Sequence, residues 1–254
     1  VPALETFTAD YPAHKQTDTA WPYLGDVCLR TNDLAKARQA YEHSLSAHPE
    51  GRLADRARFG LGRTLALQGE TEGALKAFTA LAEKGGKDWA DRAWFQVGQV
   101  QAGAKRYDEA VAAFAKVETV APQSALISEA RLNRAEALLK LSRRDDAVSL
   151  LKALAADAPQ TLAARAAFAL GTAELEGGDA TAALAQLDES AKRFAKTPMA
   201  AALVFRSAEA SLKLGKPDDA RARFLRAAEA DPNDPWADDA LARAARLALD
   251  RGDA

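Results

Sequence analysis

One spacing constrains the fold of this 254-residue chain more than any other feature. A small residue recurs every 36 or 37 positions, in the series Gly25, Gly62, Gly98, Ala135, Gly171, Ala208 and Ala245. Alanine lies 12 residues after each of the first six, and a large residue follows four positions later, in the series Tyr41, Phe78, Phe114, Leu151, Leu187 and Phe224. A fixed period in this range is typical of stacked structural repeats. We therefore expect one elongated array instead of separate globular domains.

Each repeat has the pattern of two helices folded back on each other. In residues 91–122, Trp94, Val97 and Val100 follow helical spacing. Phe114 lies on the apolar stripe of the following helix, and Pro122 ends it. The small residue allows the two helices to approach closely, and the large residue fills the space behind it. Such a hairpin cannot bury both of its faces alone, so the pattern predicts an all-α fold of stacked hairpins.

The motif residues of the third repeat are Trp94, Val97-Gly98, Ala110, Phe114 and Pro122. With them the chain resembles the tetratricopeptide repeat family. The segment from Ala166 to Gly171 is similar to a motif of the bacterial cell-envelope members, those of the TolA-binding and outer-membrane-assembly lipoprotein type. The resemblance implies a right-handed α-solenoid, a superhelix of stacked helix-turn-helix hairpins with about 14 helices. The chain departs from the family where its first-helix tyrosine is replaced, by Cys28, Leu65, Gln101, Leu138, Glu174 and Ser211.

The period predicts a single array over residues 1–254. Its divisions are 1–12, the second helix of a truncated repeat; six full repeats at 18–54, 55–90, 91–127, 128–163, 164–200 and 201–237; and 238–254, the first helix of a further repeat or a cap. Because both ends fall within a repeat, we expect the chain to be part of a longer protein. Pro232 is expected to close the sixth repeat, and left-handed glycine at Gly85-Gly86 to stop the second.

The sequence offers little for catalysis. The only histidines are His14, His43 and His48, and none of the usual metal-ligand spacings occurs. Cys28 lies at an inward position and is expected to be a core residue. We expect no catalytic, cofactor or metal site, and the chain is interpreted as a protein that is not an enzyme.

Charge and hydropathy limit the partners. The net charge is −2, whereas nucleic-acid binding normally needs a basic excess. No apolar run of 18 or more residues is present, which argues against direct membrane insertion. The compartment is left open between the bacterial cytoplasm and the periplasm or cell envelope.

The resemblance implies that first helices line a concave groove in which a protein or peptide segment binds. The positions that would face this groove are Arg56, Phe59, Arg63, Arg92, Phe95, Gln99, Leu132, Glu136, Arg165, Phe168, Phe205 and Glu209. The arginines favour an acidic or carboxylate-bearing ligand with apolar character. The carboxylate clamp of chaperone adaptors is absent, since its positions in the first repeat are Pro22 and Asp26.

Two alternatives stay open for these residues. The phenylalanines either pack in the core between repeats or expose part of each ring to the groove. The arginines either meet a ligand or pair with neighbours such as Asp55 and Asp91. The sequence therefore predicts a non-enzymatic protein-interaction scaffold. The alternative is a structural spacer of a larger envelope or coat-like protein that self-associates end to end.

Overall fold

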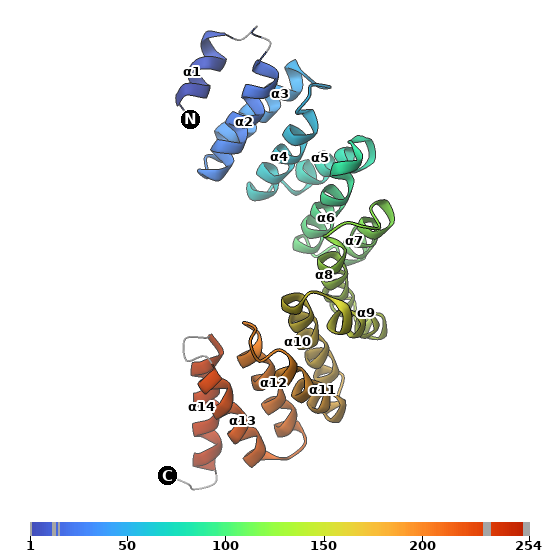
Figure 1. The fold of residues 1–254 in the computed structure, drawn as a ribbon, viewed down its shortest axis with the longest axis vertical. Coiled ribbons are helices and arrows are strands. Elements are labelled where there is room, and N and C mark those ends of the chain that lie inside the picture. Colours follow the sequence, from blue (N-terminus) through green and yellow to red (C-terminus); the bar gives the residue numbers. More distant parts are fainter. Residues whose placement is uncertain (1, 12–13, 15, 231–234, 251–254) are drawn as a thin grey trace. The chain divides into compact units, whose positions relative to one another are not determined.

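The computed structural model describes residues 2–11, 14, 16–230 and 235–250, apart from the side chain of Lys87. These residues form fourteen α-helices and no strand, so the expected all-α helical-repeat fold is confirmed (Figure 1). The helices are α1 (Pro2–Asp10), α2 (Thr17–Arg30), α3 (Leu34–Ala47), α4 (Ala54–Leu67), α5 (Thr71–Lys84), α6 (Lys87–Gly103), α7 (Tyr107–Val120), α8 (Ile127–Lys140), α9 (Arg144–Asp157), α10 (Gln160–Glu176), α11 (Ala180–Arg193), α12 (Ala200–Lys213), α13 (Pro217–Ala230) and α14 (Pro235–Asp250).

The chain divides into two compact units, residues 1–137 and 138–254, with the boundary inside α8. In the first unit α2 packs on α3, α4 on α5 and α6 on α7, and each hairpin stacks on the next. In the second unit α10 pairs with α11 and α12 with α13, and α14 packs on α13. The first helices of successive hairpins also touch, α2 with α4, α4 with α6, α10 with α12, and α12 with α14. We call the side that they form in each unit the first-helix face.

The recurring glycines are the points of closest approach between paired helices. A Cβ atom added at Gly25 would lie 2.5 Å from the Tyr41 ring, and one at Gly62 would lie 2.7 Å from Phe78. Tyr41 and Phe78 are fully buried. The interpretation that a small residue admits a large partner 16 positions later therefore holds at these sites.

Each hairpin turns through one residue with left-handed backbone. The residues are Asn32, Gly69, Lys105, Ser142, Gly178 and Gly215, with φ between 59° and 89°. One residue later, a backbone N–H donates back to the carbonyl five residues earlier, as from Glu70 to Leu65 at 2.9 Å. This geometry satisfies carbonyls at the end of the first helix. The turn therefore recurs with the period of the sequence, whether or not its residue is glycine.

The left-handed stop expected at Gly85-Gly86 is wrong. Gly85 has φ −73° and ψ 169°, which is extended backbone. The Gly86 N–H donates to Asp55 Oδ2 at 2.9 Å. Because a side chain of the preceding first helix meets this loop, the chain continues extended into α6.

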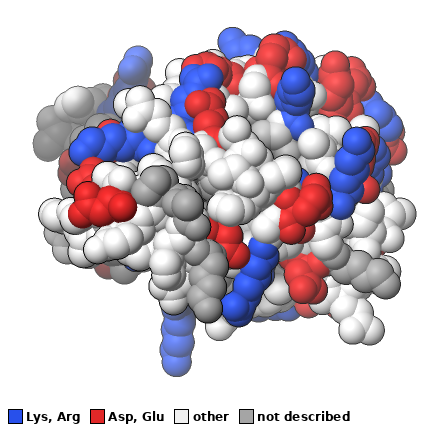
Figure 2. Space-filling view, turned by 90° about the horizontal axis from the view of Figure 1, so that it is seen from above, with Lys and Arg blue, Asp and Glu red and all other residues white. Residues whose placement is uncertain are grey.

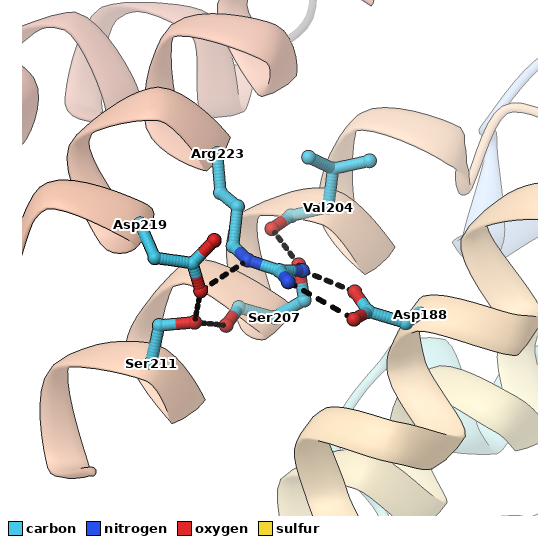
Figure 3. Close-up of polar contacts among 6 residues, drawn as sticks. All are labelled: Asp188, Val204, Ser207, Ser211, Asp219 and Arg223. Atoms are coloured by element: carbon cyan, nitrogen blue, oxygen red, sulfur yellow. Dashed lines mark hydrogen bonds and ion pairs between the residues drawn. The ribbon is translucent and has the colours of Figure 1, made fainter. Parts of the chain in front are cut away.

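Polar side chains join neighbouring helices in the second unit. Arg223 of α13 donates from Nε to Asp219 at 2.9 Å and reaches across to both carboxylate oxygens of Asp188 in α11 (Figure 3). Ser207 and Ser211 of α12 complete the network, and Ser211 donates to Asp219 at 2.7 Å. The Arg223 side chain is only 15% exposed, whereas Asp188 and Asp219 are 35% and 43% exposed, so the network links three helices at the edge of the packed interior.

Cations from both neighbouring repeats meet the carboxyl end of α10. Arg144 of α9 donates to the Glu174 carbonyl at 3.1 Å, and Lys213 of α12 donates to the Leu175 carbonyl at 2.8 Å. The guanidinium of Arg144 occupies the space that a Cβ at Gly177 would need. Positive charge here complements the helix dipole and satisfies terminal carbonyls.

Pro232 and residues 251–254 lie outside the described residues. The division into six full repeats at the predicted boundaries stays a prediction. Four first helices begin one residue before the predicted boundaries, whereas three begin three or four residues before them, α6 at Lys87, α10 at Gln160 and α14 at Pro235.

Candidate protein-binding surface on the first-helix face

The first unit contains an open pocket of about 580 Å³ between its first helices. We call it the arginine pocket. Its lining comes from α2, α4 and α6, with Tyr41 of α3 below, and comprises Tyr23, Asp26, Val27, Leu29, Arg30, Tyr41, Arg56, Phe59, Gly60, Arg63, Trp89 and Arg92. Four arginines and one acidic residue therefore share a pocket with three partly exposed aromatic rings, those of Tyr23, Phe59 and Trp89.

The single acid of this pocket is already satisfied from within the chain. Asp26 accepts a hydrogen bond from the Tyr41 hydroxyl at 2.6 Å and pairs with Arg56 at 2.5 Å. Burial and this hydrogen bond to Asp26 raise the pKa of Tyr41, which keeps the hydroxyl protonated as the donor. The Arg56 guanidinium also lies 5.0 Å from the centre of the Tyr23 ring. Arg56 is thus held in place by Asp26 and Tyr23.

The other three arginines of the pocket have no carboxylate partner among the described residues. Asp55 pairs with Arg58, and Asp91 accepts from Ser124, so neither neutralises a pocket arginine. Arg92 instead lies 5.5 Å from the Trp89 ring centre. Of the two alternatives for the predicted arginines of this pocket, internal pairing holds for Arg56, through Asp26, but among the described residues not for Arg63 and Arg92.

A second pocket of about 450 Å³ adjoins the first. It shares Phe59 and Arg92 with the arginine pocket and is also lined by Asp91, Phe95, Gln96, Ser124, Ala125 and Leu126. Phe59, Phe95, Ala125 and Leu126 make half of this lining apolar, and the Asp91 carboxylate accepts hydrogen bonds from Ser124 and from the Arg92 backbone N–H. The first-helix face of this unit thus offers two contiguous hollows.

Around Phe168 and Phe205, the corresponding face of the second unit is filled by its own side chains, and an open pocket of about 490 Å³ lies between α12 and α14. Trp236 lies between Phe168 and Phe205, with ring centres 5.9 Å and 4.8 Å away. Glu209 pairs with Arg206 at 2.5 Å and with Arg243 at 2.9 Å. The predicted residues Phe168, Phe205 and Glu209 therefore take part in an internal cluster.

The predicted phenylalanines, and Leu132 at the equivalent position, differ in whether they are buried between repeats or exposed to the groove. Phe95, Leu132 and Phe205 are buried, whereas Phe59 and Phe168 are half-buried. Gln99 and Glu136 are exposed, and Arg165 is partly exposed. Of the twelve predicted groove residues, the arginine pocket brings together Arg56, Phe59, Arg63 and Arg92.

Sequence reasoning missed Tyr23, Arg30 and Trp89. Trp89 lies nine residues before Gly98, as Trp236 lies nine before Ala245, and this shared position was a usable signal. The predicted start of the third repeat at Asp91 leaves Trp89 outside that repeat, whereas α6 begins one turn earlier, at Lys87. Arg30 is the last residue of α2, and no periodic signal marks it.

Two further observations bear on partners. Acidic and basic side chains are interspersed across the face drawn in Figure 2. Within the part of the chain that the structure describes, no helix is both long and apolar enough to cross a membrane.

Cys28, predicted to be a core residue, is buried at 1% exposure, and burial raises the pKa of its thiol.

Comparison with solved structures shows the same fold. A tetratricopeptide repeat protein from Parabacteroides merdae has a TM-score of 0.60 and 20% identity, over 96% of this chain and 90% of its own. The apo form of RapI has a TM-score of 0.69 and 13% identity, over 99% of this chain and 81% of its own. YrrB, described as a TPR protein with an unusual peptide-binding site, has a TM-score of 0.52 and 14% identity, over 92% of this chain and 96% of its own.

No curated protein matches the chain. The tetratricopeptide repeat family model matches it in five segments, residues 1–52, 24–91, 74–125, 132–196 and 168–235. These segments cover most of the sequence, and the recurring hairpins with their glycine contacts agree with the match. The chain therefore belongs to the tetratricopeptide repeat family.

Proposed function

We propose that this chain is a non-enzymatic scaffold that binds an extended protein segment on the first-helix face of its first unit. Repeats of this family generally act as non-catalytic scaffolds for protein interactions. The observation behind this placement is the arginine pocket, where three arginines with no carboxylate partner in the described part of the chain lie beside exposed aromatic surface. Aromatic and arginine side chains in hollows are the residues that dominate binding energy at protein interfaces.

Peptide display tests this proposal. A library of random peptides would be selected against the whole chain, and the selected peptides would be tested against Arg92→Glu. Arg92 is exposed and joins the two pockets, so its reversal should abolish most selected ligands without affecting the core. Phe95→Ala is a poorer probe, because Phe95 is only 8% exposed and packs against Phe114.

Arg226→Glu provides the control. Arg226 is also an exposed arginine, but it lies on α13 in the other unit. The Arg226 variant should retain the ligands. Selected peptides that bind the Arg92 variant as well as the natural chain would contradict the proposed site.

A second candidate function is end-to-end self-association as a structural spacer. It is favoured by α14, where Leu241 and Leu249 are 50% and 66% exposed. Light scattering should then show a molar mass that rises with concentration, and the double change Leu241→Gln with Leu249→Gln should remove the rise. A constant monomer mass at high concentration would contradict this function.

The cellular setting is also a proposal. The resemblance to envelope members and the absence of catalytic motifs agree with a bacterial cytoplasmic or cell-envelope scaffold. Fractionation of cells that express the tagged full-length protein would decide between the two compartments.

A further inference from the structure

The second unit shows how this type of surface accommodates a carboxylate. Glu209 is held between Arg206 and Arg243 at 2.5 Å and 2.9 Å. Both guanidiniums lie on aromatic rings, Arg206 at 5.3 Å from the Phe168 centre and Arg243 at 5.0 Å from that of Phe205. Charge-assisted bonds to a carboxylate thus combine with cation–π contacts beneath the arginines.

The arginine pocket of the first unit has the same rings in the same register. Phe59 and Phe205 each lie three residues before the small residue of their repeat, at Gly62 and Ala208. Phe59 packs against Trp89 with ring centres 5.3 Å apart, and Phe205 packs against Trp236 at 4.8 Å. The two units therefore contain equivalent aromatic pairs, with Phe205 buried in the second and Phe59 half-buried in the first.

The repeats that contain Phe59 and Phe205 differ in the residue that follows their small residue, Gly62 or Ala208. In the second unit this position is Glu209, which neutralises two arginines. In the first unit it is Arg63, which is exposed and has no ion pair among the described residues. Asp26 cannot take the place of Glu209, because Tyr41 and Arg56 already bind it. The arginine pocket thus retains an excess of positive charge from Arg30, Arg63 and Arg92.

The second pocket adds an apolar requirement. It opens beside Phe59 and Arg92, and Phe95 and Leu126 contribute to its lining. A ligand that reaches both hollows must place an anionic group near Arg92 and an apolar group on the far side of Phe59. An extended peptide does so with two nearby side chains, since its residues advance by roughly 3.3–3.6 Å each.

We propose that the first unit recognises a protein segment in which an acidic side chain lies close to an aromatic one. The carboxylate occupies the arginine pocket, in the role that Glu209 plays in the second unit, and the ring occupies the second pocket. This inference rests on the proposed function and names the chemistry of its ligand.

Fluorescence anisotropy with designed peptides tests the inference on the whole chain. Fluorescein-labelled peptides of about ten residues would carry one Glu and one Phe, one to four positions apart, in a Gly/Ser background. At least one spacing should bind, and replacing its Glu by Gln or its Phe by Ala should each weaken affinity roughly ten-fold or more. The affinity of the Glu peptide should also fall as salt rises.

Variants of the protein provide the matching half of the experiment. Arg63→Glu should weaken the Glu peptide roughly ten-fold or more and should strengthen a peptide with Lys in that place. Arg226→Glu should leave both affinities unchanged, since Arg226 is an exposed arginine far from this pocket in sequence and lies in the other unit. Circular dichroism would verify the helix content of each variant, and Arg63→Gln replaces Arg63→Glu if the latter loses helix.

Several results would overturn the inference. These are equal binding of the Glu and Gln peptides, binding unaffected by Arg63→Glu, no binding of any spacing up to about 1 mM, or tighter binding of single-stranded RNA than of any peptide. If display selects peptides that need Arg92 but lack an acidic residue, the inference fails while the proposed function stands. If selected peptides ignore Arg92, the proposed function itself fails.

Discussion

At the scale of single residues, the small residue of each repeat decides how closely two helices pack. Gly62 meets the Phe78 ring, Gly98 meets the Phe114 ring, and Gly171 meets Leu187. Interiors are close-packed, so an added methyl group at such a point must displace a buried side chain.

Gly62→Ala is therefore expected to destabilise the chain by about 1–3 kcal/mol through overpacking. Urea denaturation followed by circular dichroism would measure the change. Gly103→Ala is the matched control, because Gly103 ends α6 and an added Cβ meets nothing within 4 Å. There alanine should stabilise by about 0.5–1 kcal/mol, and equal effects of the two changes would contradict this account.

Glu174 is a buried carboxylate whose charge is poorly compensated. It is 7% exposed, its Oε2 has no hydrogen-bond partner among the described residues, and Lys152 is 3.9 Å from its Oε1. Burial raises the pKa of the Glu174 carboxyl above its ordinary value, against the attraction of Lys152. The folded chain therefore binds this proton more tightly than the unfolded chain does.

Because the pKa of Glu174 is higher in the folded chain, ionisation of this carboxyl lowers the free energy of unfolding as pH rises from about 4.5 toward neutrality. Glu174→Gln should raise the urea midpoint at pH 7 relative to the natural chain, and the difference should shrink at lower pH. Exposed Glu176 lies on the same helix, so Glu176→Gln should show no such trend. A pH-independent effect of Glu174→Gln would rule out titration of this carboxyl as the cause.

At the scale of the element, each hairpin depends on one left-handed residue after its first helix. Gly69, Gly178 and Gly215 adopt this backbone without a steric cost, but Lys105 and Ser142 adopt it at φ 60°. A non-glycine residue in this region carries a penalty of about 1–2 kcal/mol.

Ser142→Gly should accordingly stabilise the chain by about 0.5–1 kcal/mol, after the greater freedom of glycine in the unfolded chain is subtracted. Thermal or urea denaturation would measure it. Gly178→Ala is the converse test, because Gly178 has φ 89° and an added Cβ has open space, so only the backbone matters. It should destabilise by about 1 kcal/mol, and a stabilising Gly178→Ala would contradict the explanation.

At the scale of the whole molecule, stability is distributed over contacts between neighbouring helices. The Arg223 network joins α11, α12 and α13, and the Asp26–Tyr41–Arg56 network joins α2, α3 and α4. In repeat arrays each hairpin depends mainly on its neighbours, so a local weakening should stay local.

Arg223→Lys keeps the charge but loses the bidentate contact with Asp188, so it should lower the free energy of unfolding by about 1–3 kcal/mol. Hydrogen exchange should then accelerate in α11 to α13, while amides of α2 to α5 keep their protection. Arg226→Lys serves as the control and should alter neither region. Equal acceleration in both units would show that the chain unfolds as one cooperative body.

The sequence alone determined the architecture of this protein. A repeat of 36 or 37 residues, with its small and large partners, was sufficient to predict paired helices, because helix pairing is a local consequence of spacing. The resemblance to the tetratricopeptide repeats gave Phe59, Arg63 and Arg92 as groove positions, although it could not show which of the twelve candidates form one hollow.

Only the tertiary structure decided which of those residues are accessible. Phe59, Phe95 and Phe205 occupy equivalent positions, and each ring packs against the large residue of its second helix. Phe95 and Phe205 are nevertheless buried, whereas Phe59 is half-buried. Arg56 pairs with Asp26 across 30 positions, whereas Arg63 has no ion-pair partner among the residues that the structure describes. A periodic pattern identifies the face on which a side chain lies, but burial and charge pairing depend on residues that folding brings together from other helices.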